Sequence, residues 1–233
     1  MMRVTVLRGL FTAAVLALAP VSAFAQASSV PLFNGKDLGG WSHFLVDPKV
    51  PASDVWSVRD GVLICKGEPL GYLQTNAEYT SFRLVVEWRW APGAAARLGK
   101  APNSGVLMRV NGDPKPKGIP RAYEAQLQAG SAGDLYGFWG MPLDGAADRR
   151  RQASGHELLG DMVGFRKTAE AEHAEGEWNT CDITFDGASL TVLVNGTKVN
   201  DATGATVMPG RIALQSEGGE IHFRRVELWP LGR

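Results

Sequence analysis

Residues 82–90 read Phe82-Arg83-Leu84-Val85-Val86-Glu87-Trp88-Arg89-Trp90 and place a large apolar side chain at every second position. Successive side chains of a β-strand point to opposite faces, so the five apolar residues from Phe82 to Trp90 would share one face. Arg83, Glu87 and Arg89 would lie on the other face. This pattern predicts a strand with one buried face and one polar face, which is typical of an antiparallel sheet.

The same alternation recurs on both sides of this stretch. Turn dipeptides follow several of the runs, namely Asp60-Gly61, Asp186-Gly187 and Asn195-Gly196. Helical periodicity is weak and confined to residues 168–174, and no alternation of strands with helices is present. We therefore predict an all-β fold, a two-sheet antiparallel jelly-roll sandwich of the concanavalin A-like type. The remaining predicted strands cover residues 56–59, 62–66, 105–110, 122–128, 178–185, 190–195, 211–215 and 220–228.

Residues 130–176 form the exception, because they are rich in glycine and contain no clear strand pattern. We expect one long loop insertion here, either a lid or binding loop or a decorated surface loop. The segment contains Trp139 and His156. Its basic run, Arg149 to Arg151, follows Asp144 and Asp148, and we expect this run to be solvated.

The first 25 residues have the features of a secretory signal peptide. A basic region with Arg3 and Arg8 precedes an apolar stretch, and Ala23-Phe24-Ala25 provides a small-residue cleavage site. The apolar stretch is too short to span a bilayer. We expect cleavage after Ala25, export to the periplasm or the medium, and a single jelly-roll domain over residues 26–233 without a membrane span.

Charge and cysteine content exclude several classes of function. The chain has 24 Lys+Arg and 24 Asp+Glu, so it lacks the basic surface that binds nucleic acid. Cys65 and Cys181 are too few for a disulfide scaffold. They would either form one bridge after export or remain small core residues.

Polar side chains on one predicted strand give the sharpest local signal for a site. In Tyr123-Glu124-Ala125-Gln126-Leu127-Gln128, the acid and the two amides share one face of the strand. On a concave sheet face, Glu124, Gln126 and Gln128 would supply an acid or base and hydrogen-bonding groups for a polar ligand. The alternative is an ordinary solvent-facing sheet surface.

Neighbouring strands offer similar groups on their polar faces. Such carboxyl, amide and guanidinium groups bind sugar hydroxyls, and the rings of Trp41, Trp139 or Tyr136 could cover the apolar side of a sugar. The candidates on these strands are Glu87, Arg89, Asn103, Arg109, Gln215 and Glu217.

A bound metal or nucleotide has little support. His156, Asp161 and His173 lack the tight spacing of metal ligands, and His222 alternates beside Arg224. Gly-x-Ser-x-Gly, Gly-x-Gly-x-x-Gly and phosphate-loop motifs are absent. We predict no cofactor, with a divalent metal as the open alternative.

Seven segments in order make the chain resemble the 3-keto-disaccharide hydrolase domain family. Each segment is weak alone, but the series covers residues 32–231. It begins with Leu32-Phe33-Asn34-Gly35-Lys36-Asp37-Leu38-Gly39-Gly40-Trp41. It continues with Trp56-Ser57-Val58-Arg59-Asp60-Gly61, Glu87-Trp88-Arg89, Asn103-Ser104-Gly105-Val106 followed by Arg109, Tyr123-Glu124-Ala125-Gln126, Gly176-Glu177-Trp178-Asn179, and the ending Leu214-Gln215-Ser216-Glu217-Gly218 with Phe223-Arg224-Arg225-Val226-Glu227-Leu228.

The resemblance implies a concanavalin-like jelly roll related to laminarinase-type glucanases. Those enzymes carry alternating acids on one concave strand, whereas the matching strand here retains only Glu124 as an acid. This departure argues against a two-carboxylate glycosidase on that strand. The activity implied is cleavage of small oligosaccharides or glycosides already oxidised at C3.

A C3 ketone acidifies the C2 proton, so one carboxylate could start elimination of the C1 substituent before water adds back. On this hypothesis Glu124 is the general base and Arg109 steadies the enolate. Glu217 or His156 would protonate the leaving oxygen. The groups expected to bind the sugar are Asn103, Gln126, Gln128, Gln215, Glu87, Trp139 and His156.

Three alternatives remain open at this point. A carbohydrate-binding module of the same fold would tolerate Gln in place of Glu124, whereas acid–base chemistry would not. A protein-interaction domain would use residues 130–176 to contact a partner. An ordinary glycosidase would need Glu87 or Glu217 close to Glu124.

Overall fold

The computed structural model describes residue 1, residues 28–115 and residues 118–232. Within these residues the chain forms two antiparallel eight-stranded sheets, which confirms the predicted all-β sandwich. The two helices and the 3-10 turn are short: α1 (Ala52–Val55), α2 (Ala94–Leu98) and Ala147–Arg149. The expected signal peptide and its cleavage site after Ala25 lie outside the described residues.

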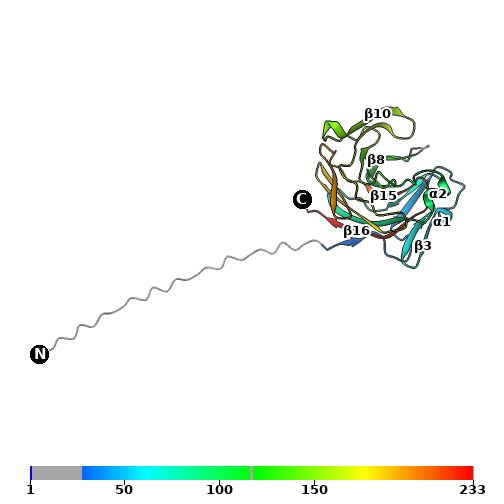
Figure 1. Ribbon diagram of the computed structural model, residues 1–233, viewed down its shortest axis with the longest axis horizontal. Helices are drawn as coiled ribbons and strands as arrows, with labels where there is room; N and C mark the ends of the chain where they lie inside the picture. The colour runs from blue at the N-terminus through cyan, green and yellow to red at the C-terminus, as the bar shows by residue number, and fades with distance from the viewer. Residues whose placement is uncertain (2–27, 116–117, 233) are drawn as a thin grey trace.

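Sheet A and sheet B lie face to face (Figure 1). Sheet A has the order β14 (Thr197–Ala202), β13 (Ser189–Val194), β12 (Asn179–Asp186), β6 (Phe82–Trp90), β16 (Ile221–Pro230), β4 (Val62–Cys65) and β3 (Trp56–Arg59), with β1 (Val30–Pro31) beside β16. Sheet B has the order β10 (Arg150–His156), β11 (Gly160–Phe165), β9 (Leu135–Gly137), β8 (Arg121–Gln126), β7 (Gly105–Asn111), β15 (Arg211–Ser216), β5 (Gly71–Thr75) and β2 (Trp41–Leu45).

The main core fills the space between the sheets. All five apolar residues that alternate along β6, from Phe82 to Trp90, are buried there, as predicted. Sheet B contributes Val106 and Met108 from β7 and Tyr123 and Ala125 from β8. Burial of apolar surface on this scale is the main force that holds the two sheets together.

Two predicted hairpin turns have the expected backbone geometry. Asp60 and Gly61 have φ values of 50° and 75°, and Asn195 and Gly196 have φ values of 49° and 79°. Two consecutive left-handed residues define a type I′ turn, whose twist matches that of the flanking strands. These turns fix the β3–β4 and β13–β14 pairings.

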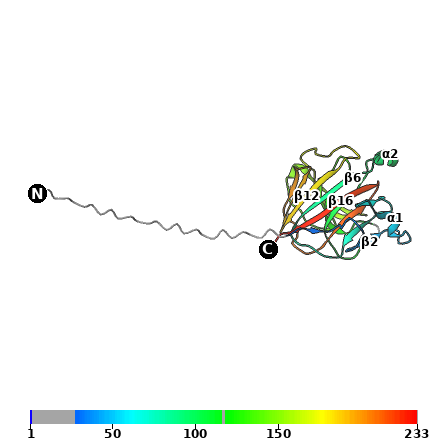
Figure 2. The ribbon, with the colours of Figure 1, turned by 90° about the horizontal axis from the view of Figure 1, so that it is seen from below.

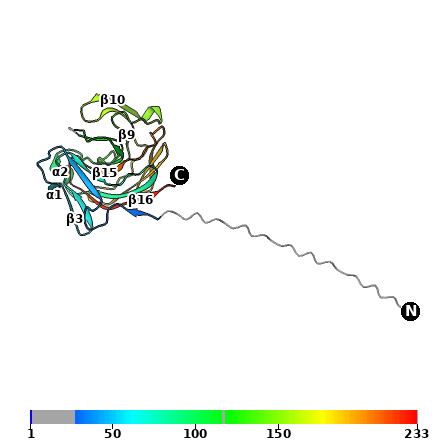
Figure 3. The ribbon, with the colours of Figure 1, turned by 180° about the vertical axis from the view of Figure 1, so that it is seen from behind.

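The prediction of one long structureless insertion at residues 130–176 is wrong. The segment contains β9, β10 and β11, which extend sheet B beyond β8 by three strands. Figures 1 and 3 show β10 at the side of the molecule opposite to β16. β10 is exposed along nearly its whole length, so it lacks the apolar alternation that reveals a half-buried strand. Residues 168–174 form no helix.

Both cysteine thiols are free and buried. Cys65 lies on β4 and Cys181 on β12, and β16 and β6 separate these two strands within sheet A. The bridge considered from the sequence is therefore absent, and both residues serve as small core side chains. Among the described residues, helices are too short and too polar to cross a membrane.

A second apolar cluster covers the opposite side of sheet B, here called the pocket face, which carries Tyr72, Leu107, Glu124 and Ala213. Leu107 and Ala213 have no exposed surface. They are buried by side chains from the loop before β8 and from the β9–β11 region, including Ile119, Phe138, Leu159 and Met162. The extension of sheet B therefore folds back over its own face.

Candidate active site

A cavity of about 280 Å³ opens on the pocket face of sheet B, beside β8. Its polar walls come from β8, β9, β10 and the segments that flank β7 and β15, and its apolar walls come from the second cluster. The residues that line it are Asn103, Ile119, Glu124, Gln126, Tyr136, Phe138, Arg151, Leu159, Met162 and Glu217.

Gly105 allows two polar side chains to meet at the base of this cavity. A Cβ atom on Gly105 would overlap both the Oε1 atom of Glu124 and the Oε1 atom of Gln215. The missing side chain therefore provides the space in which the carboxyl group and the amide converge. The role of Gly105 is close approach, because its backbone does not adopt a left-handed conformation.

Several buried polar atoms at this point have no hydrogen-bond partner among the described residues. They are Oδ1 of Asn103, Oε1 of Glu124, and both Oε1 and Nε2 of Gln215. Native proteins pair nearly all buried polar groups, because an unpaired group costs about 1–3 kcal/mol. A concentration of such atoms around one cavity is typical of a site that binds a polar ligand.

Electrostatics single out Glu124 and Glu217. Burial raises the pKa of Glu124 well above its ordinary value, and the nearby carboxyls of Glu217 and Asp134 raise it further. Burial also raises the pKa of Glu217 to about 7, although Lys100 opposes the shift. Both carboxyls therefore hold their protons to higher pH than an exposed carboxyl does, and Glu124 is the more deeply buried of the two.

A chain of hydrogen-bonding groups runs along the cavity wall next to Glu124. The Tyr136 hydroxyl lies 3.3 Å from Oδ2 of Asp134, and Nη1 of Arg151 lies 3.5 Å from the same hydroxyl oxygen. Oδ1 of Asp134 accepts a hydrogen bond of 2.7 Å from the backbone N–H of Lys167. Asp134 is buried, so it anchors the hydroxyl of Tyr136 from below the cavity surface.

Sequence reasoning placed Glu124, Glu217, Asn103, Gln126 and Gln215 correctly in one neighbourhood. The N–H of Asn103 donates to the carbonyl of Gly218, which joins the segment before β7 to the segment after β15. Oε1 of Gln126 accepts from the N–H groups of Leu127 and Gln128, each at 3.0 Å, so this amide is fixed in the wall. Gln128 lies past the end of β8 and does not line the cavity.

Arg109 does not face the cavity, so its expected place beside the substrate is corrected. The register between β7 and β8 shifts after Met108, and Arg109 has a φ of 50°. This bulge turns the side chain into the space between the sheets, over the ring of Phe185 at 3.6 Å. There the guanidinium donates to the carbonyl oxygens of Thr80, Thr206 and Gly187.

Glu87 also lies away from the cavity, on the outer face of sheet A. Its carboxylate accepts from Nε of Arg224 at 2.5 Å and from Nη1 of Arg225 at 3.4 Å. The alternation along β6 predicted its polar face correctly. The sheet to which that face belongs could not be read from the alternation, because both sheets have a polar side.

Trp139 and His156 do not line the cavity either. The indole N–H of Trp139 donates to the carbonyl of Ile119 at 2.8 Å, so the ring packs in the second apolar cluster. His156 is exposed near the β10–β11 turn, and its Nδ1 accepts from the N–H of Leu158 at 3.2 Å.

Tyr136 and Arg151 are the main wall residues that the sequence did not assign. The sequence offers Tyr136 only as one of three aromatic rings, and it predicts a solvated Arg151. For Tyr136, the available signal was its position two residues after Asp134, which places both side chains on one face of a strand. For Arg151 there was no signal, because the strand β10 is exposed. Among the described residues, no cluster of three or more His, Cys, Asp or Glu is placed to hold a metal ion.

Solved structures with a similar fold include both enzymes and binding modules. A protein from Parabacteroides distasonis, provisionally named a glycosyl hydrolase, is 21% identical with a TM-score of 0.60, covering 88% of this chain and 94% of that one. The carbohydrate-binding module CBM66 from Bacillus subtilis is 12% identical with a TM-score of 0.54, over 81% and 94%. The β-glucanase of Bacillus licheniformis is 11% identical with a TM-score of 0.54, over 89% and 100%.

At these identities the structural similarity establishes the jelly-roll fold alone. No curated protein sequence is significantly similar to the chain. The sequence profile of one family matches residues 28–228, which include both carboxyls and every other residue that lines the cavity. The chain belongs to the family of 3-keto-alpha-glucoside-1,2-lyase-like domains.

Proposed function

We propose that this protein cleaves small glycosides that carry a ketone at C3, by removal of the C2 proton and elimination of the C1 substituent. The observation that carries the proposal is a pair of carboxyls on one cavity, the buried Glu124 and the half-buried Glu217, with unpaired polar atoms around them. Both have a raised pKa, as acid–base catalysis near neutral pH requires. The family name supports the substrate class.

The difference in burial between the two carboxyls supports a division of roles. Glu217, with a pKa of about 7, is the better candidate for the base that takes the C2 proton. Glu124 is the more deeply buried carboxyl, and because burial favours its protonated form it is the better candidate for the acid that protonates the leaving oxygen. This assignment reverses the roles expected from the sequence, where Glu124 was the base.

The bonds and protons balance in this scheme. The C2–H bond breaks, its proton goes to Glu217, and its electron pair forms an enolate with the C3 carbonyl. The enolate then collapses to a C1–C2 double bond, the C1–O bond breaks, and the leaving oxygen takes the proton of Glu124. Addition of water across the C1–C2 double bond would complete a hydrolysis and return a 3-keto sugar.

The covered pocket face supports a small substrate. A polymer bound along this face would need an open floor, but Leu107 and Ala213 on the floor are completely buried. The cavity beside Glu124, of about 280 Å³, is at the lower end of the range for ligand sites and suits one or two sugar rings. We expect cleavage of short glycosides and no release of product from polysaccharides.

Export forms part of the proposal, because the basic, apolar and small-residue segments before residue 26 match a secretory signal. The expected mature protein begins at Gln26. Expression of the full chain in a bacterium that secretes proteins, followed by amino-terminal sequencing of the periplasmic fraction, checks both the export and the cleavage point. Recovery of uncleaved chain in the cytoplasm would contradict it.

The central experiment measures turnover of methyl and 4-nitrophenyl 3-keto-glucosides, beside the unoxidised glucosides, by NMR in D2O. Wild type should cleave only the keto sugars and incorporate deuterium at C2. Glu217→Gln should lose cleavage of both keto substrates and the exchange at C2, by about 10²–10⁴-fold. Glu124→Gln should lose cleavage of the methyl substrate, while 4-nitrophenolate, which leaves without a proton, is still released.

The control is Glu87→Gln, a matched change on the outer face of sheet A, which should leave all rates unchanged. The opposite pattern, with exchange lost in Glu124→Gln and retained in Glu217→Gln, would restore the sequence-based roles. Binding of either sugar without turnover would instead support a carbohydrate-binding module. The similarity in fold to a known carbohydrate-binding module favours this second function. If the protein neither binds nor cleaves these sugars, both proposed functions are contradicted.

A further inference from the structure

Four residues form a straight row across the strands at the edge of sheet B. The register pairs Glu124 of β8 with Tyr136 of β9, Tyr136 with Gly164 of β11, and Gly164 with Arg151 of β10. Residues directly opposite each other in neighbouring strands point to the same face of a sheet. The row therefore aligns a carboxyl, a phenol and a guanidinium on the pocket face, with one position left empty.

Gly164 provides the empty position. A Cβ atom at this residue would overlap the ring of Tyr136. The space that the missing side chain leaves lets the Tyr136 ring lie across β11 and lets Arg151 approach its hydroxyl from the next strand. The hydroxyl oxygen and Nη1 of Arg151 are 3.5 Å apart as a result.

Arg151 is the basic side chain among the described residues that line the cavity. It is exposed, so its charge carries little desolvation cost before a ligand binds. Its contact with Tyr136, which Asp134 holds from the other side, gives the long side chain a preferred position above the cavity. Burial and the carboxyl of Asp134 raise the pKa of Tyr136, so the phenol remains protonated and neutral.

The elimination proposed above needs a positive group at the C3 oxygen, and Arg151 is the basic residue that lines the cavity. Negative charge develops on the C3 oxygen when the C2 proton leaves, and a preorganised donor at that oxygen lowers the barrier. The sequence assigned this part to Arg109, which instead lies between the sheets over Phe185. The two carboxyls cannot supply the positive charge, because they are either neutral or negative.

We propose that Arg151 is the catalytic residue that stabilises the enolate oxygen at C3, and that Tyr136 and Asp134 are positioning residues that hold its guanidinium at the cavity. This inference rests on the proposed function. The N–H groups of Arg151 donate to the C3 oxygen, most strongly while the C2 electron pair is delocalised onto it. When the C1–O bond breaks and the C3 carbonyl re-forms, these hydrogen bonds weaken again.

The test compares Arg151→Gln, Arg151→Lys and Tyr136→Phe with wild type on methyl and 4-nitrophenyl 3-keto-glucosides. Arg151→Gln should lower kcat about 100-fold or more on both substrates, with KM changed less than about threefold, and should slow deuterium exchange at C2 equally. Arg151→Lys should recover part of the rate, because it restores the charge without the planar fork. Tyr136→Phe should lower kcat less, about tenfold.

The matched control is Arg150→Gln. Arg150 is the neighbouring residue on β10, contacts Gln152 at 3.3 Å and does not line the cavity, so its loss should leave the rates unchanged. A loss confined to KM, or a loss on the methyl substrate alone, would overturn the role at the enolate. So would an Arg151→Gln enzyme within about threefold of wild type.

The outcomes separate this inference from the function on which it rests. If wild type cleaves the keto sugars and Arg151→Gln cleaves them equally well, only the assignment of Arg151 fails. If wild type neither cleaves nor exchanges them, the proposed function fails and the inference fails with it. Equal thermal unfolding midpoints of Arg150→Gln and Arg151→Gln would show that the rate change does not come from a loss of folding.

Discussion

The cavity of sheet B and the outer face of sheet A contain the same kinds of side chain, namely carboxyl groups, arginines and aromatic rings. The two regions differ in how their carboxyls are paired. On the outer face, seen with β6, β12 and β16 side by side in Figure 2, Arg83 and Arg225 flank the ring of Trp229. Arg89 and Arg224 flank Trp178 in the same way. In the cavity, Arg151, Tyr136 and Phe138 stand beside two carboxyls.

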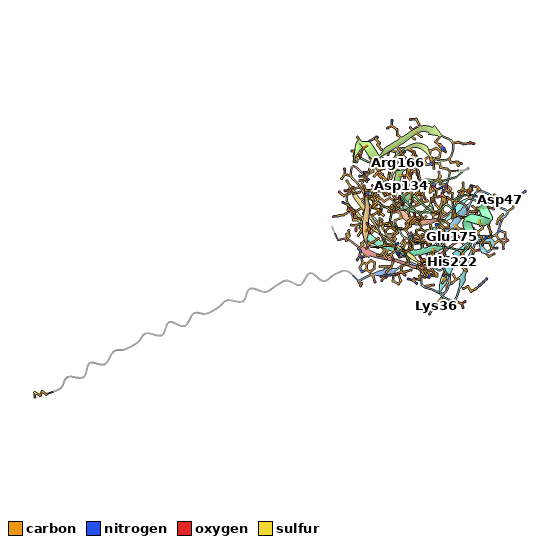
Figure 4. The ribbon with its side chains drawn as sticks, viewed as in Figure 1. Lys36, Asp47, Asp134, Arg166, Glu175 and His222 are labelled. Atoms are coloured by element: carbon orange, nitrogen blue, oxygen red, sulfur yellow. The ribbon has the colours of Figure 1, made fainter. Side chains whose placement is uncertain are left out.

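The difference lies in how each carboxyl is paired. Glu87 on the outer face is 18% exposed in its side chain and is bound by Arg224 and Arg225, whereas Glu124 is 2% exposed and its Oε1 has no partner among the described residues. In Figure 4, Asp134 beside the cavity lies on the upper side of the molecule and His222 of the outer face on the lower side. Paired and solvated charge stabilises a surface slightly, while a buried carboxyl with an unpaired oxygen costs stability and is typical of a functional site.

Gly105→Ala should disrupt the cavity and lower activity strongly. The added Cβ would displace the Glu124 carboxyl and the Gln215 amide, and a displacement of about 1 Å can lower a rate about 100-fold. Initial rates on a 3-keto-glucoside measure the loss. Gly232→Ala, with open space at its Cβ, is the matched control. A rate within about twofold of wild type would show that the close approach at Gly105 is not needed.

Arg109→Met tests whether this buried guanidinium acts in folding rather than in the site. Removal leaves the carbonyl oxygens of Thr80, Thr206 and Gly187 without their donor, which should lower the free energy of unfolding by about 3 kcal/mol or more. The midpoint temperature of thermal unfolding should fall by about 6–12 °C. The exposed counterpart Arg83→Met, which loses a surface pair with Asp182, should change stability by about 1 kcal/mol or less.

The variant Arg109→Met should keep kcat on a keto sugar at temperatures where it remains folded. A large loss of kcat without a loss of stability would return Arg109 to the catalytic machinery.

Glu217→Gln should sharpen the comparison through stability against pH. Folding raises the pKa of Glu217 from 4.5 to about 7, so the native state holds a proton that the unfolded state releases between these values. The free energy of unfolding therefore falls as pH rises through this window. The glutamine of Glu217→Gln does not titrate, so the variant lacks this loss of stability. The difference in unfolding midpoint, variant minus wild type, should therefore increase by at least about 2 °C between pH 5 and pH 8.

A difference between Glu217→Gln and wild type that stays constant from pH 5 to pH 8 would contradict the raised pKa. Thermal scans at several pH values measure it directly.

Glu87→Gln should give the smallest effect. The change weakens two partly exposed ion pairs with Arg224 and Arg225, which contribute about 1 kcal/mol or less in water. Thermal unfolding should shift by no more than about 4 °C, and 150 mM added salt should reduce the difference from wild type. A larger, salt-independent loss would indicate that the outer face has a role beyond solvation.

The sequence located the strands well where one of their faces is buried. The alternation along β6 gave both the strand and its buried face, because a period of two is visible when every second residue packs in the core. The strands β9, β10 and β11 were missed for the same reason. Nearly all of β10 is exposed, and β9 has only three residues, so neither leaves a pattern of sufficient length.

The site was predicted in part and for identifiable reasons. Glu124, Gln126 and Gln215 were placed on the correct faces because β8 and β15 are regular strands there. Arg109 was placed on the wrong face because one bulged residue reverses the alternation. Gln128 was wrongly placed beside Gln126 because β8 ends at Gln126. Arg151 could not be found, since its position depends on pairing across three strands.

The amino-acid sequence alone determined that the chain is a β-sandwich, which segments form its buried strands, and which residues on them are polar. These properties follow from local alternation and turn chemistry. Tertiary structure decided which of the two polar faces became a site. The packing of β9–β11 leaves Oε1 of Glu124 buried with no partner among the described residues, while Glu87, on an equally regular strand, pairs with two arginines in water.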